Sequence, residues 1–296
     1  MDAVLPLTAA DLERFEILRR SLVRNVVGLD TLWVIVPDAD LPAISVAVSQ
    51  SLGPQLCLVP ELSWLPELKV FTRVGGWYRQ MLLKLEAANH VRSDFYLTLD
   101  ADVIATRKHD LNELCVGGRA PCHVDHQDLH PKWYAAARDL LGLPLPRAGI
   151  SHGVTPALLH AQSVRRLQEH LARRWEGGRY GTGLRGFKQR LGKARTWIEP
   201  GSAVEPWRAL LACSRPWAEY ALYFSFLEAT GSFERYCEER DECLYSVHGS
   251  VWSEKAFASW DPKSSFQGSG PPYFIVVQSN THIPADAVAK RVAPYL

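Results

Sequence analysis

The first hundred residues alternate short apolar runs with segments whose apolar positions recur at helical spacing. The runs are rich in β-branched and other apolar residues and are bounded by polar residues or proline, which predicts strands. The predicted strands are Ala3–Leu7, Leu32–Pro37, Gln55–Val59 and Phe95–Leu99. The predicted helices between them run from Thr8 or Asp11 to about Arg24, from Ala43 to Leu52 and from Tyr78 to Asn89. This alternation predicts an α/β fold in which helices flank a mainly parallel sheet.

The rest of the chain is less regular. Residues 110–129 show no clear period and are expected to form a loop. Thr155 and Pro156 have the residue types of a helix N-cap and first turn, so a helix is expected from about Ala157. Other expected elements are a helix over Trp133–Leu141, a helix after Pro216 and a strand over Phe274–Val277. No repeat, low-complexity tract or clear linker is present, so we expect a single domain over residues 1–296 with an irregular C-terminal part.

Composition narrows the class of protein. Of 296 residues, 47% are hydrophobic and 22% are charged, the balance of an ordinary soluble globular protein. The formal net charge is only +1, which argues against a nucleic-acid partner. The longest apolar runs are far shorter than the roughly 20 residues that span a bilayer. The N-terminus lacks a basic region followed by an apolar stretch, so we expect a cytoplasmic protein.

The neutral total hides two blocks of opposite charge. Residues 163–195 contain ten Lys or Arg against two Glu, a local charge of +8. Residues 219–254 contain eight acidic residues against two Arg, a local charge of −6. The basic block would suit an anionic acceptor, a diphosphate-linked lipid or peripheral contact with the inner membrane. It is equally typical of a solvated helix face.

Asp100-Ala101-Asp102 is the sharpest chemical signal. It follows directly after an apolar strand, at the edge of the sheet where ligands of α/β proteins bind. Carboxylates two residues apart on extended backbone point the same way and can face one divalent cation. Mg²⁺ and Mn²⁺ prefer such oxygen ligands, completed by phosphate and water. A solvated turn would explain the pair equally well.

The segment Phe95–Ile104 resembles the strand and DxD motif of GT-A glycosyltransferases. Residues 76–85 are similar to the helix that, in several such families, brings a basic residue over the nucleotide sugar. From Val4 to His282 the chain resembles an uncharacterised bacterial group of predicted GT-A transferases. The resemblance implies a nucleotide-binding half over about residues 1–105 and an acceptor- or sugar-binding half over about residues 106–296.

The activity implied by this resemblance is a metal-dependent sugar transfer. The donor would be a nucleoside diphosphate sugar, with a UDP-sugar favoured. The acceptor would be a glycan, a lipid-linked glycan or another hydroxyl compound, and surface polysaccharide synthesis would be one context. The cofactor would be Mn²⁺ or Mg²⁺, held by Asp100 and Asp102, with Asp100 also contacting the donor.

Further candidate residues for the donor lie on the first helices. Gln80 and Lys84 are one helical turn apart, away from the apolar stripe, and Lys84 could meet phosphate or sugar oxygens. Thr8 and Asp11 follow the first strand, where the resemblance places the nucleobase and ribose. A solvated lysine and a simple helix cap are the plain alternatives for these residues.

A third metal ligand is expected from far along the chain. The resemblance favours a histidine near the C-terminus, and His282 follows the strand that ends at Val277. His248 is the rival candidate. Either one could instead be an ordinary loop histidine.

His152-Gly153 and Glu219 complete the predicted site. Glycine allows a close backbone approach, so His152 and Gly153 are candidates to bind the sugar, or else form a structural turn. Glu219 opens the helix after Pro216, and the resemblance puts a catalytic acid of this kind at a helix start in inverting enzymes. As a general base it would take the proton of the acceptor hydroxyl. Favourable interaction with the helix dipole is the plain alternative.

Two other functions are alternatives to sugar transfer. A sugar-nucleotide pyrophosphorylase should carry a glycine-rich phosphate loop soon after the first strand, but Val4–Asp11 contains no glycine. A non-catalytic carbohydrate-binding protein would not need paired acids, and removing metal would not change its affinity for its ligand.

Overall fold

A five-stranded sheet forms the centre of the molecule, with strand order β11-β5-β1-β3-β4. The strands β1 (Asp2–Pro6), β3 (Thr31–Val36), β4 (Gln55–Pro60) and β5 (Phe95–Thr98) are parallel, and β11 (Ala157–His160) pairs antiparallel with β5. The predicted α/β fold with a mainly parallel sheet is therefore confirmed. This computed structural model describes residues 1–49, 55–69, 74–144, 147, 149–153, 155–176, 205–214, 216–240, 244–267, 270 and 272–296.

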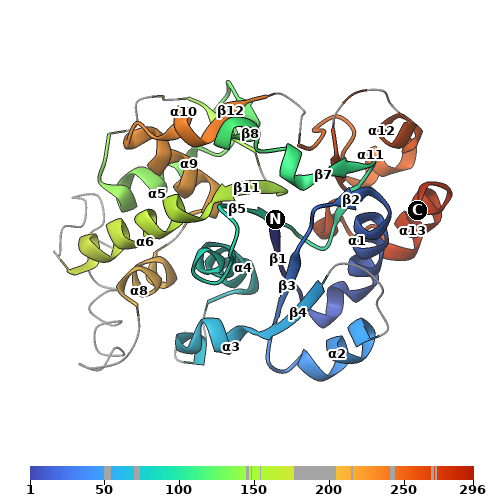
Figure 1. Cartoon of the computed structure of the whole chain (residues 1–296), viewed down its shortest axis with the longest axis horizontal. Helices are drawn as coiled ribbons and strands as arrows, with labels where there is room; N and C mark the ends of the chain where they lie inside the picture. The colour runs from blue at the N-terminus through green and yellow to red at the C-terminus, as the bar shows by residue number, and fades with distance from the viewer. Residues whose placement is uncertain are drawn as a thin grey trace.

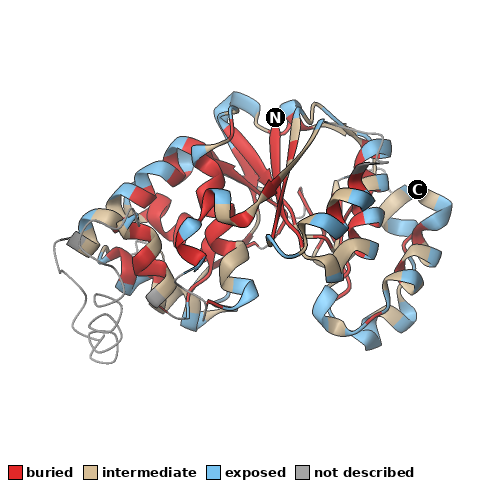
Figure 2. Cartoon of the chain, turned by 90° about the horizontal axis from the view of Figure 1, so that it is seen from below, coloured by how far each residue is buried: buried red, intermediate tan, exposed pale blue. Residues whose placement is uncertain are grey.

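Two groups of helices lie on either side of the sheet, as Figures 1 and 2 show from two directions. One group consists of α1 (Leu12–Asn25), α2 (Leu41–Ser49), α11 (Glu254–Ser259), α12 (Lys263–Gln267) and α13 (Ala285–Val292). The other consists of α3 (Glu61–Trp64), α4 (Gly76–Glu86), α5 (Pro131–Leu141), α6 (Ala161–Glu176), α8 (Pro206–Cys213), α9 (Glu219–Ala229) and α10 (Phe233–Tyr236).

Short strands connect the remaining segments. The expected loop over residues 110–129 is not fully irregular, because it contains two 3-10 turns and the short strands β8 and β9. The short strands are β2 (Val26–Val27), β6 (Val103–Ala105), β7 (His109–Asp110), β8 (Ala120–Cys122), β9 (Val124–Asp125), β10 (Ser151–His152), β12 (Cys237–Glu239) and β13 (Phe274–Val276). Of these, β6 and β13 pair antiparallel, which ties the C-terminal part of the chain to the segment that follows β5.

The helix expected from Ala157 is wrong at its start, because residues 157–160 form the edge strand β11. Ala157, Leu158 and Leu159 are all buried, so the run is apolar on both faces. Periodicity does not distinguish such a short buried strand from the start of a buried helix. Thr98 Oγ1 donates a hydrogen bond to the carbonyl oxygen of Ala157, and the helix α6 begins only at Ala161.

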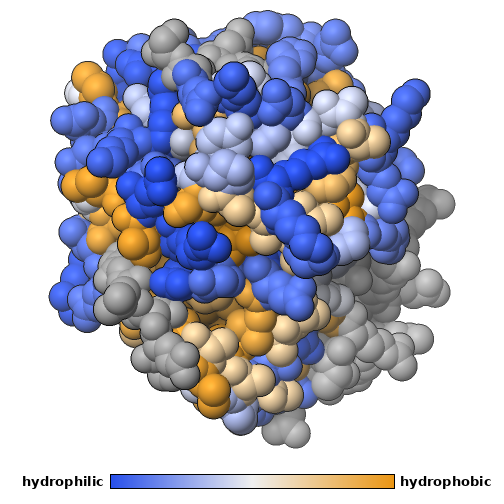
Figure 3. All heavy atoms as spheres, turned by 90° about the vertical axis from the view of Figure 1, so that its right-hand side faces the viewer, coloured by the Kyte–Doolittle hydropathy of each residue, from blue (hydrophilic) through white to orange (hydrophobic). Residues whose placement is uncertain are grey.

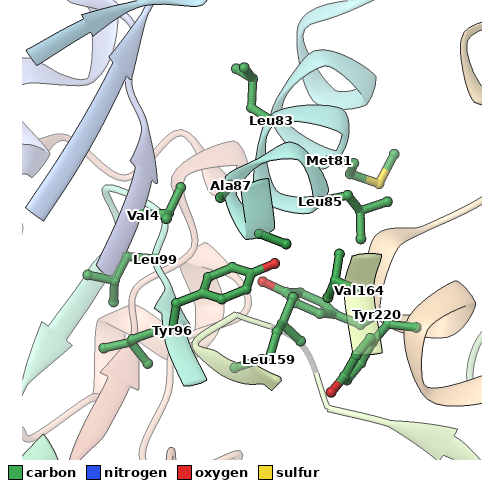
Figure 4. Close-up of a cluster of buried hydrophobic side chains, with 14 of the residues drawn as sticks. Val4, Met81, Leu83, Leu85, Ala87, Tyr96, Leu99, Leu159, Val164 and Tyr220 are labelled. Carbon is green, nitrogen blue, oxygen red and sulfur yellow. The ribbon is translucent and has the colours of Figure 1, made fainter. Parts of the chain in front are cut away.

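The main hydrophobic core joins both predicted halves of the chain. It contains Met1, Leu5 from β1, and Trp217 and Leu227 from the C-terminal half. Figure 4 shows side chains from α4, β5, β11 and α9 packed together in this core. Buried residues are concentrated in the strands and on the inner sides of the helices (Figure 2).

A smaller core cluster holds the C-terminal helices against α1. It includes Ile17 from α1, Ile275 from β13 and Val288 from α13. Arg14 reinforces this contact, because its buried guanidinium donates to the carbonyl oxygens of Val277 and Ile283, at 2.9 and 2.6 Å. On this side of the molecule, polar side chains cover most of the surface and apolar atoms lie between them (Figure 3).

Leu159→Ala tests the placement of β11 in the core. Leu159 is fully buried, so we expect the free energy of unfolding to fall by about 2–5 kcal/mol. Urea unfolding followed by circular dichroism measures this change. Val116→Ala is the matched control, because Val116 is 57% exposed, and its effect should stay within about 0.5 kcal/mol. Equal effects of the two substitutions would contradict a buried β11.

Candidate active site

Asp100 and Asp102 lie in the turn that connects β5 to β6. The backbone N–H of Leu99 still bonds to Val4 of β1, so Asp100 stands at the carboxyl end of the parallel sheet. The N–H of Val103 donates to the carbonyl oxygen of Asp100 at 3.2 Å and closes the turn. The chain then leaves the sheet in β6. The acidic pair therefore lies at a strand end, as expected, but in a turn rather than on extended backbone.

Asp102 is held from the end of β13. Its Oδ2 accepts a hydrogen bond from the N–H of Ser279 at 2.8 Å, and its carbonyl oxygen accepts one from the N–H of Val277 at 3.0 Å. Burial and the neighbouring charge of Asp100 raise the pKa of Asp102 to about 6. Ionising Asp102 beside the charged Asp100 therefore costs free energy. A bound cation would offset this cost.

Lys84 is the centre of the polar contacts. Its Nζ lies 2.8 Å from Asp100 Oδ1 and 3.1 Å from Glu219 Oε1, and it donates to Thr155 Oγ1 at 3.0 Å. The residue is only 3% exposed, although it belongs to a helix whose remaining buried residues are mostly apolar. Burial opposes its charge, but the carboxylates of Asp100 and Glu219 outweigh burial and raise the pKa of Lys84. Lys84 therefore stays an ammonium ion at every physiological pH.

Glu219 is the first residue of α9 and is almost fully buried. Burial raises the pKa of its carboxyl group, while the charge of Lys84 opposes the rise. The next residue, Tyr220, shares hydrogen bonds of 2.8 Å with Thr98 Oγ1 and with Thr155 Oγ1. The end of β5, the start of α9 and Thr155 are thus joined in one network with Lys84.

These residues open onto a cavity of about 170 Å³. Five predicted site residues line it together, namely Gln80, Lys84, Asp100, Asp102 and Glu219. The other lining residues were not singled out from the sequence as site residues. They are Trp77, Met81, Trp133, Thr155, Ala218, Tyr220, Trp252, Val276 and Gln278.

Thr155, Tyr220 and the tryptophans carried only weak signals in the sequence. Thr155 has the pattern of a helix cap, and Tyr220 lies within an apolar run. Their polar atoms reach the site because β11 and α9 pack beside β5 and α4, contacts between segments more than 50 residues apart. Trp77 was visible as an aromatic residue at the start of the helix that carries Lys84.

Thr8 and Asp11 lie just beyond β1 and do not line the cavity. The Thr8 hydroxyl donates to Asp11 Oδ2 at 2.7 Å, and the N–H of Ala9 donates to Asp40 Oδ2 at 2.9 Å. The pair therefore stands at the carboxyl end of a parallel strand, as expected. Its contact with a nucleotide stays a prediction.

His152 and Gly153 lie outside the cavity as well. The His152 side chain is 1% exposed and stacks on Phe224, and its ring nitrogens hydrogen-bond to Glu228 Oε1 and to the hydroxyl of Tyr134. Burial lowers the pKa of this imidazole. A side chain at Gly153 would meet the Tyr245 hydroxyl at 2.9 Å, so close packing explains the glycine. Their predicted contact with sugar stays a prediction.

His282 follows the 3-10 turn Ser279–Thr281, whose first residue holds Asp102. His282 is exposed, adopts the left-handed conformation with φ of 60°, and does not line the cavity. His248 is also exposed and lies outside it. Within the described ranges, no three His, Cys, Asp or Glu side chains are grouped so that they could hold a metal ion. The third ligand therefore stays a prediction, while the two aspartates have the oxygen donors that Mn²⁺ and Mg²⁺ prefer.

Solved structures with a similar fold include glycosyltransferases. Mouse xyloside xylosyltransferase 1 in its apo form matches with a TM-score of 0.50 and 13% identity, over 96% of this chain and 100% of that chain. The galactosyltransferase LgtC with donor and acceptor sugar analogues matches with a TM-score of 0.43 and 11% identity, over 100% of this chain and 96% of that one. The glycosyltransferase GlyE of Streptococcus pneumoniae has a TM-score of 0.39 and 11% identity, over 99% and 63%.

The fold is thus that of the GT-A glycosyltransferases. The model of a family of unknown function, DUF6492, matches residues 1–296, and the chain belongs to this family. No curated protein matches the sequence. Within the described part of the chain, no helix is long and apolar enough to cross a membrane.

Lys84→Met tests the charge balance of the site. Removing the ammonium leaves the carboxylates of Asp100 and Glu219 without their counter-charge. We therefore expect the free energy of unfolding to fall by about 3–5 kcal/mol at neutral pH. The pKa of Glu219 is higher in the folded than in the unfolded protein, so the folded protein binds more protons. The free energy of unfolding therefore falls as the pH rises. Without Lys84 the pKa of Glu219 rises further, and this fall becomes steeper.

Urea unfolding of both proteins between about pH 5 and pH 8 measures the two slopes. The double variant Lys84→Met/Glu219→Gln is the matched control, because it removes one of the stranded charges. It should regain part of the lost stability and show a shallower dependence on pH than Lys84→Met. Parallel curves for wild type and Lys84→Met would show that the lysine does not compensate these carboxylates.

Proposed function

We propose that this protein is a metal-dependent glycosyltransferase that moves a sugar from a nucleoside diphosphate sugar to a hydroxyl acceptor. The observation that carries the proposal is the pair Asp100 and Asp102 at the carboxyl end of a parallel strand, on the wall of a cavity that also holds Lys84 and Glu219. Ligands of open α/β sheets bind at this end of the strands. The GT-A fold raises the expectation by analogy alone.

Asp100 and Asp102 would hold Mn²⁺ or Mg²⁺, with His282 as the proposed third ligand. Such an ion neutralises the charge that builds on a departing nucleoside diphosphate. The two carboxylates suit the ion because they are close enough for Asp100 to raise the pKa of Asp102. A cation beside them offsets this repulsion.

Lys84 orders the groups around the reacting atoms. Its ammonium fixes Asp100 on one side and Glu219 on the other, and it brings positive charge close to the position of the diphosphate. Fixed charges in a partly dry site stabilise developing charge without reorganisation. Gln80 on the same helix is the proposed donor contact beside it, with Thr8 and Asp11 for the nucleobase and ribose, and His152 and Gly153 for the sugar.

Glu219 is the proposed general base if the reaction inverts the configuration of the sugar. Its carboxylate lines the cavity and is fixed by Lys84 at 3.1 Å. The raised pKa of Glu219 makes it a stronger base than an exposed glutamate. If the reaction retains configuration, the same carboxylate positions the sugar.

The donor, the acceptor and the cellular location are proposed from the sequence. A UDP-sugar is the favoured donor, and a glycan or lipid-linked glycan is the acceptor. Residues 1–105 would bind the nucleotide, and residues 106–296 would bind the acceptor. The protein would work in the cytoplasm, and its basic block, residues 163–195, would make peripheral contact with the inner membrane. Residues 177–195 of this block lie outside the described residues.

Asp102→Asn tests the metal assignment. Asparagine keeps an oxygen that can accept the hydrogen bond from Ser279 but loses the negative charge. Over a panel of nucleotide sugars we expect wild type to release nucleoside diphosphate from one donor with Mn²⁺. The variant should lose about a hundredfold or more in rate, equivalent to about 2.7 kcal/mol of activation free energy. A coupled assay of nucleoside diphosphate release measures both.

Asp286→Asn is the matched control. Asp286 is an exposed aspartate that pairs with Lys290 on α13 and does not line the cavity, so its substitution removes the same charge outside the site and should leave the rate unchanged. Undiminished turnover of wild type in excess chelator would refute the metal assignment.

Glu219→Gln tests the proposed base. The substitution keeps the shape and a hydrogen bond acceptor for Lys84 but cannot take a proton. For an inverting reaction we expect transfer to the acceptor to fall by about 10²–10⁴-fold, the usual contribution of general base catalysis. Product analysis by chromatography and by NMR of the anomeric proton gives both rate and stereochemistry. Near-normal transfer by the variant would exclude Glu219 as the base.

A further inference from the structure

The exposed aromatic surface of the protein is concentrated at the cavity. Among the described residues, Trp77 and Trp252 are the two aromatic side chains that are exposed, at 47% and 37%, and both line the cavity. By contrast, Trp64, Trp207 and Trp217 are buried in the core. Large apolar side chains left in contact with water beside a pocket are typical of a ligand-binding surface.

The indole rings are held in place by neighbouring groups. The ring of Trp77 lies 5.5 Å from that of Trp133, between centroids, and Trp133 stacks on His130 at 4.1 Å. On the other part of the wall, Trp252 Nε1 donates to the carbonyl oxygen of Val247 at 3.0 Å. Backbone hydrogen bonds from Val251 N to Val276 and from Gln278 N to Val251 join this segment to β13. The aromatic surface is therefore built before any ligand arrives.

The rings come from elements on different sides of α4. Trp133 belongs to α5 and Trp252 precedes α11, and these helices lie to the left and right of α4 in Figure 1. Trp77 lies in the first turn of α4, on the same helical face as Gln80 and Lys84. The three indoles line the same cavity as Lys84 and Glu219.

The cavity has the size of one sugar ring. Its volume is about 170 Å³. Pockets that enclose a whole drug-sized ligand are larger, about 300–1,000 Å³. The cavity therefore fits a single ring, and the remainder of a longer ligand would lie outside it.

The charges on the wall favour a neutral ligand. Asp100, Asp102 and Glu219 contribute three carboxylates against the single ammonium of Lys84, and Lys84 is already paired with two of them. When no divalent cation is bound, a sugar carboxylate or phosphate at this wall would meet uncompensated negative charge. A pyranose or furanose offers an apolar face of C–H groups for the electron-rich indoles and a rim of hydroxyl groups for Gln278 and Glu219.

We propose that Trp77, Trp133 and Trp252 bind the ring of a neutral saccharide, which is the acceptor of the reaction. This assignment of the acceptor rests on the proposed function, whereas the saccharide site itself does not. Trp133 and Trp252 belong to the C-terminal half and line the cavity, whereas Thr8 does not. The bound ring lies beside Glu219, which accepts the proton of the attacking hydroxyl in an inverting reaction.

The test is the binding of methyl glycosides in the absence of nucleotide. The probes are methyl glycosides of the common neutral hexoses and pentoses, methyl glucuronide as the anionic counterpart, and UDP, each titrated by saturation-transfer NMR. We expect a neutral glycoside to bind, with saturation on its ring C–H protons, and methyl glucuronide to bind at least about tenfold more weakly.

Trp252→Ala should weaken the binding of the neutral glycoside about tenfold, a loss of about 1.4 kcal/mol. Trp252→Phe restores an aromatic face and should bring the dissociation constant back to within about threefold of wild type. The dissociation constant for UDP should change much less than that for the glycoside. Leu129→Ala is the control, because Leu129 is 52% exposed and does not line the cavity.

Three outcomes overturn the proposal: no neutral glycoside binds, methyl glucuronide binds more tightly, or Trp252→Ala weakens UDP rather than the glycoside. The last would assign these rings to a nucleobase, which also stacks on aromatic side chains. Release of nucleoside diphosphate from the donor panel is measured separately. If no donor is cleaved but the glycoside results hold, the proposed transfer fails and the saccharide site stands.

Discussion

The candidate site depends on one buried charge. The ammonium of Lys84 lies within 3.1 Å of two carboxylates, Asp100 from the end of β5 and Glu219 from the start of α9. A buried ion is tolerated only when its partners offset the cost of leaving water, and a partner left alone is strongly destabilising. The three groups therefore constrain one another. Because they come from α4, β5 and α9, their contact also sets how these elements pack around the cavity.

Further hydrogen bonds extend this constraint to the neighbouring strands. Thr155 accepts from Lys84 and shares a hydrogen bond with Tyr220, which in turn bonds to Thr98 on β5. On the opposite side of the acidic pair, the backbone of Ser279 after β13 holds Asp102. The two aspartates are thus fixed by different parts of the fold, Asp100 through a lysine and Asp102 through a main-chain amide. Such support gives a binding site rigid geometry before a ligand is present.

Much of the site was predictable because its chemistry is local in the chain. Asp100 and Asp102 follow a strand that is recognisable by its apolar residues, and Gln80 and Lys84 share a helix face by spacing alone. Glu219 was predicted from the resemblance to inverting enzymes, which implies an acid at a helix start. The helix expected from Ala157 failed because a short, fully buried run has no period that separates strand from helix. His152 looked available in the sequence, yet its ring is buried against Phe224 and Glu228, since only packing determines which histidines reach the surface.

The sequence by itself determined the parallel sheet, the strand end that carries the acidic pair and the helix face that carries Lys84, because hydrophobic periodicity and strand ends are encoded within ten to twenty residues. Only the tertiary structure decided that Lys84 pairs with Glu219, 135 residues further along, and that Trp77, Trp133 and Trp252 line one cavity. Such contacts arise when elements distant in sequence pack to bury their apolar faces, and that packing depends on the whole chain at once.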